Sequence, residues 1–173
     1  LFDAVRGVQK GIFSSRNSAE ETEGGTRGLN AFNSDGFTLG AEVSDMAGSC
    51  NGNNDTYVSW NWKANGQGSS NTDGSINSTY TSANTTSGFS IVEYTGTGSG
   101  ATVGHGLGVK PKIIFFKNLS ATANWVVQST LLANRTQLVL NGTDAQNTDS
   151  RLGNLDSWSN SVFSLGTYGD MNG

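Results

Sequence analysis

The sequence predicts an all-β fold, a sandwich or barrel of short antiparallel strands joined by polar loops. Gly, Ser, Asn and Thr supply 83 of the 173 residues, and these residue types favour turns. Short runs of β-branched and aromatic residues recur between them, which is typical of a sandwich or barrel. An internal repeat, described below, is the third observation behind this prediction.

The composition excludes several classes of protein. The net charge is −4 and the pI is near 4.8, which argues against nucleic acid as a partner. No apolar run is long enough for insertion into a membrane. Cys50 is the single cysteine, so neither a disulfide framework nor a cysteine-based zinc site forms within one chain. The low net charge and the aromatic content of 9% argue against a disordered chain.

The clearest alternating pattern is Tyr57–Trp62. One face of this run carries Val58, Trp60 and Trp62, so it predicts a half-buried antiparallel strand. We therefore expect Trp60 and Trp62 to be core or interface residues.

The other expected strands are shorter apolar runs, and helix is confined to a turn or two at residues 3–10 and 18–23. The runs are Gly11–Phe13, Gly36–Leu39, Phe89–Tyr94, Lys112–Lys117, Trp125–Val127, Gln137–Leu140 and Ser161–Leu165. Lys112–Lys117 is apolar without alternation, which predicts a central strand covered on both faces. Trp125 is a further expected core or interface residue.

Residues 1–40 align without a gap on residues 127–166, at an offset of 126. Apolar positions and turns coincide along this alignment, for example Ile12 with Leu138 and the strand ending at Leu39 with the strand ending at Leu165. The segment Asp45–Gly48 then meets Asp170–Gly173 after a slip of one residue. Such an offset indicates a tandem repeat of about 125 residues.

The repeat predicts three regions in the chain. Residues 1–64 form the later part of one repeat, 65–87 a polar connector, and 88–173 the earlier part of the next repeat. Both chain ends fall inside a repeat, so we expect the sequence to be a window on a longer protein. An incomplete sandwich exposes strand edges, which invite pairing with another chain.

Several motifs together resemble a domain repeated in virion proteins of marine and cyanobacterial tailed phages. They are Asn33–Gly40, Tyr57–Ala64, Gly88–Gly96, Thr102–Pro111 and Val162–Gly166. The resemblance covers most of the chain apart from the connector. It implies a concanavalin-like or jelly-roll β-sandwich, a place in a tail fibre or similar appendage of the virion, and contact with the host surface. It brings no catalytic residues.

The chemistry-bearing residues predict no catalytic or cofactor site. His105 lies in a glycine-rich bend without a nucleophile motif nearby, so we expect it to be structural. The run Gly96–Gly100 lacks the helix that a phosphate cradle needs, so we expect a hairpin loop there. Two loops, Asn51–Asp55 and Asn71–Ser75, carry oxygen ligands suitable for structural calcium, but neither matches the calcium-loop pattern.

The best candidate for an exposed aromatic is Trp158, in the polar segment Asp156–Asn160. Trp158 and Tyr168 are therefore the candidate contacts to a glycan or to another protein.

Three functions remain open from the sequence. The first is a structural and adhesive part of a phage tail fibre or virion appendage, which assembles with copies of itself or with other virion proteins and contacts host surface glycans. The second is a monomeric carbohydrate-binding module. The third is a polysaccharide-cleaving tailspike, which needs a pair of carboxylates across a cleft.

Overall fold

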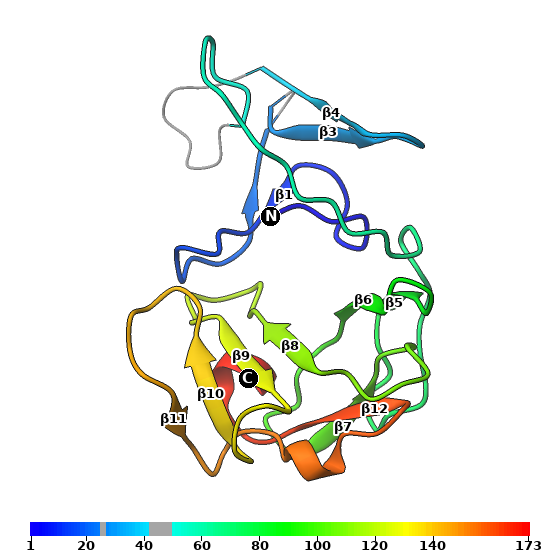
Figure 1. Cartoon of the computed structure of the whole chain (residues 1–173), viewed down its shortest axis with the longest axis vertical. Helices are drawn as coiled ribbons and strands as arrows, with labels where there is room; N and C mark the ends of the chain where they lie inside the picture. Colours follow the sequence, from blue (N-terminus) through cyan, green and yellow to red (C-terminus); the bar gives the residue numbers. More distant parts are fainter. Residues whose placement is uncertain (25–26, 42–49) are drawn as a thin grey trace.

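The regular secondary structure is almost entirely β-strand, and the chain forms two lobes, as the computed structural model in Figure 1 shows. The structure describes residues 1–24, 27–41 and 50–173. A smaller N-terminal lobe comprises the described residues up to 41, and a larger C-terminal lobe comprises residues 65–173. An irregular segment, residues 50–64, runs between them. All named strand pairs are antiparallel, which confirms the predicted fold class.

The N-terminal lobe consists of two short hairpins. In the first, β1 (Lys10–Gly11) pairs with β2 (Glu21–Thr22). In the second, β3 (Leu29–Phe32) pairs with β4 (Phe37–Leu39). Each hairpin is too small to enclose apolar side chains by itself, so the lobe depends on other contacts.

The C-terminal lobe contains the remaining elements. They are β5 (Tyr80–Asn84), β6 (Phe89–Glu93), β7 (Ala101–Gly104), β8 (Ile113–Phe116), β9 (Val126–Ser129), β10 (Thr136–Val139), β11 (Asn147–Thr148), the 3₁₀ turn η1 (Leu155–Ser157), β12 (Val162–Leu165) and the helical turn α1 (Gly169–Asn172). Strands β5 and β6 form one hairpin, β7 pairs with β12, and a four-stranded sheet has the order β11-β10-β9-β8.

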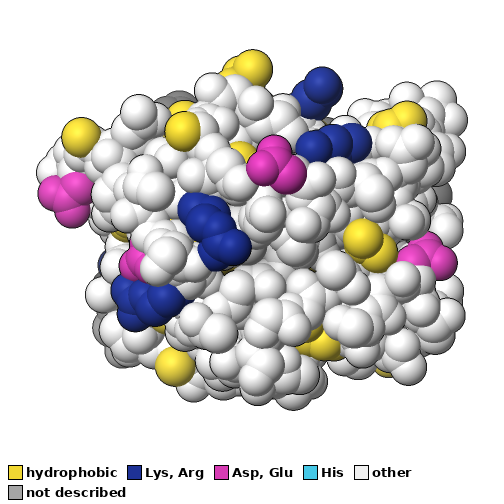
Figure 2. Space-filling view, turned by 90° about the horizontal axis from the view of Figure 1, so that it is seen from below, with side chains coloured by type: hydrophobic (Ala, Val, Ile, Leu, Met, Phe, Trp, Pro, Cys, Tyr) yellow, Lys and Arg dark blue, Asp and Glu magenta, His cyan; other side chains and the backbone are white. Residues whose placement is uncertain are grey.

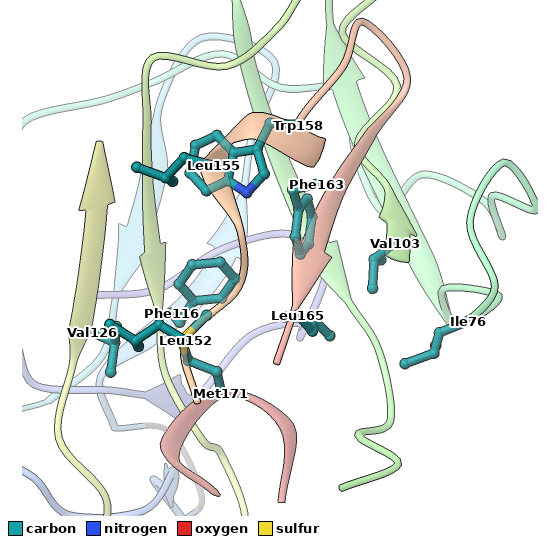
Figure 3. Close-up of a cluster of buried hydrophobic side chains, with 10 residues drawn as sticks. All are labelled: Ile76, Val103, Phe116, Val126, Leu152, Leu155, Trp158, Phe163, Leu165 and Met171. Atoms are coloured by element: carbon teal, nitrogen blue, oxygen red, sulfur yellow. The ribbon is translucent and has the colours of Figure 1, made fainter. Parts of the chain in front are cut away.

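These sheets enclose one apolar core, shown in Figure 3. Its members come from β7, β8, β9, η1, β12, α1 and the loops: Ile76, Val103, Phe116, Val126, Leu152, Leu155, Trp158, Phe163, Leu165 and Met171. The Phe163 ring lies edge-on to Phe116 at 5.6 Å and to Tyr94 at 6.1 Å between ring centroids. Such aromatic contacts add about 0.5–1.5 kcal/mol each to the burial of their surface.

The two lobes share a backbone register at the offset of 126 residues. Lys10 pairs with Thr22 in the N-terminal lobe, and Thr136 pairs with Thr148 in the C-terminal lobe. The outer neighbours of these pairs agree as well, because Leu1 and Ile12 exchange both backbone hydrogen bonds, at 2.6 and 3.1 Å. Their counterparts are the paired residues Val127 and Leu138 of β9 and β10.

Single hydrogen bonds recur at the same offset. The Glu23 N–H donates to the Gln9 carbonyl at 2.8 Å, and the Asp149 N–H donates to the Arg135 carbonyl at 2.9 Å. Gln9 and Arg135 both have positive φ, +62° and +56°, which is uncommon for residues other than glycine. The backbone pairing of residues 1–23 therefore matches that of 127–149, whereas the counterpart of the strand β3 is the 3₁₀ turn η1. Asp45–Gly48 lies outside the described residues.

The lobes contact each other along residues 13–20 and 117–125. The indole Nε1 of Trp125 donates to the Phe13 carbonyl at 2.8 Å. Backbone bonds from Ala123 to the Asn17 carbonyl and from Glu20 to the Leu119 carbonyl, both 2.9 Å, extend this contact. Trp125, an expected core or interface residue, is buried.

Four local expectations were wrong. Residues 3–10 and 18–23 form turns and the strands β1 and β2 instead of helix. Tyr57–Trp62 forms no strand and is exposed. Lys112–Lys117 contains β8, but this strand lies at the edge of its sheet, and β9 is the strand buried on both faces. Gly96–Gly100 joins strands of different sheets and is not a hairpin loop.

The stretch predicted as a polar connector, residues 65–87, is more than a loop. It contains β5 and the core residue Ile76, whose N–H donates to the Thr102 carbonyl at 3.0 Å. Polar side chains satisfy its remaining backbone groups, for example Ser82 Oγ, which donates to the Gly66 carbonyl and accepts from the Asn65 N–H. The Ser, Thr and Asn side chains of this polar stretch therefore form a hydrogen-bonded edge of the lobe.

Candidate functional site

The two lobes differ at one strand edge. In the C-terminal lobe β7 pairs with that edge of β12, whereas no described strand pairs with the corresponding edge of β4. Strand β12 pairs along its length with β7, from Val162 opposite Gly104 to Leu165 opposite Ala101. Strand β4 is the counterpart of β12 at the repeat offset. Among the described residues it pairs only with β3.

The side chains of the two strands differ in burial accordingly. Phe163 is 3% exposed, whereas its counterpart Phe37 is 37% exposed. Trp158 is likewise 3% exposed, and its counterpart Phe32 is 43% exposed. Phe32 and Phe37 are directly paired across β3 and β4, so both rings lie on one face. The N-terminal lobe therefore exposes an aromatic sheet face. The corresponding aromatic residues of the C-terminal lobe are buried by that lobe's own elements.

A second exposed apolar face lies on the C-terminal lobe. Phe115 of β8, Val127 of β9 and Leu138 of β10 are paired in register across three strands. Phe115 and Leu138 are exposed, and Val127 between them is buried. Ile113, two residues before Phe115 in the strand, extends the exposed face.

The aromatic run between the lobes is exposed too. Trp60 and Trp62 are 73% and 62% exposed, so they are not core residues of this chain. The Trp62 ring stacks on Phe89 at the start of β6, with the centroids 6.2 Å apart. Alternation alone misled here, because an alternating run becomes a strand only when a neighbouring edge pairs with it. The prediction that these tryptophans lie at an interface stays open.

The prediction that Trp158 is an exposed aromatic residue was wrong. Trp158 lies in the core beside Leu155 and Phe163 (Figure 3). Its polar neighbours suggested a solvated loop, but η1 turns the indole inward. The sequence did contain one indication: Trp158 aligns with Phe32 at the offset of 126, so both segments carry an aromatic residue at this position.

Tyr168 is half-buried and held by two neighbours. Its hydroxyl accepts from Gln137 Nε2 at 3.3 Å, and the Arg151 guanidinium lies 4.8 Å from the centre of its ring. That Tyr168 contacts a glycan or another protein stays a prediction.

A polar groove lies beside β7 and β12. Its volume is about 680 Å³, and it is lined by polar side chains and by the apolar side chains of Ala101, Leu152 and Leu165. The polar side chains include Thr102, Arg135, Asn154, Ser157, Ser164 and Thr167. The Arg135 side chain donates to the carbonyls of Ser150 and Leu152, which fixes its position. Such a lining suits a neutral or anionic polar ligand. The lower face of the molecule, seen in Figure 2, shows few charged groups among uncharged polar surface.

His105 is buried behind β12 and acts as a structural group. The Leu107 N–H donates to its Nδ1 at 3.2 Å, so its Nε2 carries the proton and donates to the Ser159 carbonyl at 3.2 Å. Desolvation lowers the pKa of His105, against a smaller opposing effect of the Ser159 carbonyl. The neutral ring thus ties the end of β7 to the loop before β12.

The loop Asn71–Ser75, one of the two considered for calcium, uses its oxygens in its own turn. Asn71 Oδ1 accepts from the Asp73 N–H at 2.8 Å, and Asn71 Nδ2 donates to Asp73 Oδ2 at 3.2 Å. In the described part of the chain, no three His, Cys, Asp or Glu side chains gather as they would around a metal ion. None of the helices described there is long and apolar enough to cross a membrane.

Comparison with known proteins places the chain in one family. A family described as Domain of unknown function (DUF7483) matches residues 1–173. No curated protein and no solved structure matches the chain.

Proposed function

Because the chain belongs to the DUF7483 family, a domain of unknown function, we propose its role from its own geometry. We propose that it is a structural and adhesive unit of a phage tail fibre or similar virion appendage. It assembles into an oligomer or fibre with copies of itself or with other virion proteins. It acts by association and not by catalysis.

One observation carries this proposal: β4 and β12 are counterparts at the offset of 126 residues, but Phe163 of β12 is buried whereas Phe37 of β4 and its cross-strand neighbour Phe32 are exposed. Among the described residues, no strand besides β3 pairs with β4. Exposed aromatic faces and unpaired edges are features of surfaces that bind other protein. The exposed face around Phe115 and Leu138 gives the molecule a second such surface, as a unit in a chain of units requires.

The test has two arms. Sedimentation velocity over a hundredfold concentration range should show species larger than the monomer, because the exposed faces gain burial on association. Antibodies raised against the chain should label an appendage of phage particles whose genome encodes it. A stable monomer that also leaves the particles unlabelled would rule the proposal out.

The polar groove favours a second candidate, a carbohydrate-binding module. Its hydroxyl and amide lining, with the fixed Arg135, offers donors and acceptors for sugar hydroxyls. A glycan array probed with the intact protein tests this reading, with Arg135→Ala as the groove variant and Arg16→Ala as a charge-matched control. Binding that survives Arg135→Ala, or no binding at all, removes the groove from consideration.

A further inference from the structure

We propose that the polar groove beside β7 and β12 binds the carboxylate of an acidic saccharide, with Arg135 as the residue that takes the charge. This inference rests on the adhesive part of the proposed function and names the class of ligand. Three features separate an anionic ligand from a neutral one: the charges around the groove, the unused donors of Arg135, and the residue that stands at the equivalent turn of the N-terminal lobe.

Arg135 is the single charged residue that lines the groove. The other lining residues are Gly, Ala, Leu, Ser, Thr and Asn, so no carboxylate is among them. Within the part of the chain that the structure describes, the half-buried Arg135 also forms no ion pair. A cation that is partly shielded from water and has no counter-ion attracts an anionic ligand.

The carboxylates that adjoin lining residues in the sequence have other partners. Asp149 precedes the lining residue Ser150, and it pairs with Arg151 at 2.5 Å. Asp156 precedes the lining residue Ser157, and its Oδ2 accepts from Asn134 Nδ2 at 2.8 Å. Neither of them neutralises the guanidinium of Arg135.

The guanidinium of Arg135 is held in place and still has unused donors. Its Nη1 donates to the carbonyls of Ser150 and Leu152. Among the described residues, Nε and Nη2 have no hydrogen-bond acceptor. These two nitrogens form one donor fork of the guanidinium, which matches the two oxygens of a carboxylate. Because the side chain is already fixed, little freedom is lost when the anion binds.

The N-terminal lobe shows that this turn does not itself need a cation. The counterpart of Arg135 at the offset of 126 residues is Gln9. Both residues have positive φ, and both carbonyls accept one backbone hydrogen bond, from Glu23 and from Asp149 respectively. A neutral side chain is therefore compatible with this backbone, and the turn does not explain the positive charge of Arg135.

The rest of the lining favours a saccharide as the carrier of the carboxylate. Ser150, Ser157 and Thr167 are exposed, and no described group bonds to their hydroxyls. A hydroxyl both donates and accepts, as the hydroxyls of a sugar do. The groove volume of about 680 Å³ also suits a small ligand. An acidic side chain of a protein partner would bring the carboxylate without the hydroxyls that complement this lining.

The probes are glucuronate and galacturonate, with glucose and galactose as their neutral counterparts. At least one uronate should bind the intact protein saturably, followed by NMR through the Nε–H resonance of Arg135. Its neutral counterpart should bind at least tenfold more weakly, because it offers no charge to the guanidinium. Equal binding of the neutral sugar, or no binding of either uronate, would overturn the inference.

Two further probes distinguish other sources of the negative charge. Glucose 6-sulfate carries a sulfate ester in place of the carboxylate, and sodium acetate carries the carboxylate without the sugar. Both should bind at least threefold more weakly than the preferred uronate. Tighter binding of the sulfate would overturn the assignment to a carboxylate. Acetate binding as tight as that of the uronate would overturn the assignment to a saccharide and favour an acidic side chain of a protein partner.

Variants place the binding in the groove. Ser150→Asp should weaken uronate binding at least tenfold, because its carboxylate competes for Arg135, while the Ser150 backbone carbonyl can still accept from the guanidinium. Ser15→Asp is the matched control, since Ser15 is exposed in the N-terminal lobe. Arg135→Gln, which installs the residue type of the equivalent turn, should abolish binding, whereas Arg16→Gln should not change it.

Uronate binding that survives both Ser150→Asp and Arg135→Gln would overturn the inference, because the charge would then be bound elsewhere. These results are separable from the proposed function. A protein that associates and labels phage particles but shows no preference for uronates refutes the inference alone. A stable monomer that leaves the particles unlabelled refutes the proposed function, whatever the sugars show.

Discussion

The described residues of segment 1–39 and their counterparts at the offset of 126, in segment 127–165, differ in what stabilises them. In the C-terminal copy, Phe163 and Leu165 belong to an apolar core. In the N-terminal copy, Arg6 forms ion pairs with Asp3 at 2.6 Å and with Glu20 at 3.1 Å. The stabilising contacts thus lie at different positions of the repeat, because the counterparts of Asp3, Arg6 and Glu20 are Ser129, Leu132 and Gln146.

The largest effect should come from exchanging the equivalent phenylalanines for alanine. Phe163→Ala should lower the free energy of unfolding by about 3–5 kcal/mol, the range for removing a buried aromatic side chain. Phe37→Ala should cost less than about 1 kcal/mol in the isolated protein, because much of its ring is already in water. Urea unfolding followed by circular dichroism checks both. Equal costs would mean that β4 is covered within the chain.

The ionic network predicts the next largest effect, confined to the N-terminal lobe. The Arg6 side chain is 6% exposed and also donates to the Lys10 carbonyl at 3.1 Å. Arg6→Ala leaves Asp3 without its cation and leaves Glu20 with Lys10 alone; loss of a buried partner costs about 3 kcal/mol. Hydrogen exchange should accelerate at β1 and β2 and stay unchanged at β9 and β12. Acceleration across both lobes would show that they unfold together.

A glycine in the C-terminal lobe gives a smaller effect. A Cβ on Gly153 would overlap the carbonyl oxygen of Ser164 in β12, so Gly153→Ala must displace backbone. We expect a loss of about 2 kcal/mol, within the range for overpacking. Gly36→Ala is the matched control, because nothing lies within 4 Å of its Cβ position. A neutral Gly153→Ala would indicate that the turn before η1 shifts freely away from β12.

The sequence predicted local structure better than it predicted burial. The runs in β6, β10 and β12 and the register of the repeat follow from residue types and spacing, which act locally. The status of Trp62, Phe115 and Trp158 does not, because each depends on whether a distant strand covers it. At 65–87 the composition predicted a polar stretch, but not that its side chains bond to the backbone of the lobe. The open edge of β4 emerged only from comparing two equivalent strands.

The smallest predicted effect is a pH dependence that belongs to one lobe. His105, the single histidine of the sequence, lies in the C-terminal lobe, and desolvation lowers its pKa in the folded protein. The unfolded chain therefore binds a proton below about pH 6.5 while the folded protein resists it. More protons on the unfolded state mean that stability rises with pH there, so it is lost as the pH falls below that value.

Urea midpoints measured at pH 7.5, 6.0 and 5.0 isolate this contribution when the wild type is compared with His105→Asn. The carboxylates titrate in both proteins, so the part of the acid loss that disappears in the variant belongs to His105. Hydrogen exchange at pH 5.0 should place that loss at β7 and β12, since the ring joins the end of β7 to Ser159. A loss of equal size in β1 and β2 would show that the two lobes share one cooperative transition, and the contrast between them would then be one of packing and not of stability.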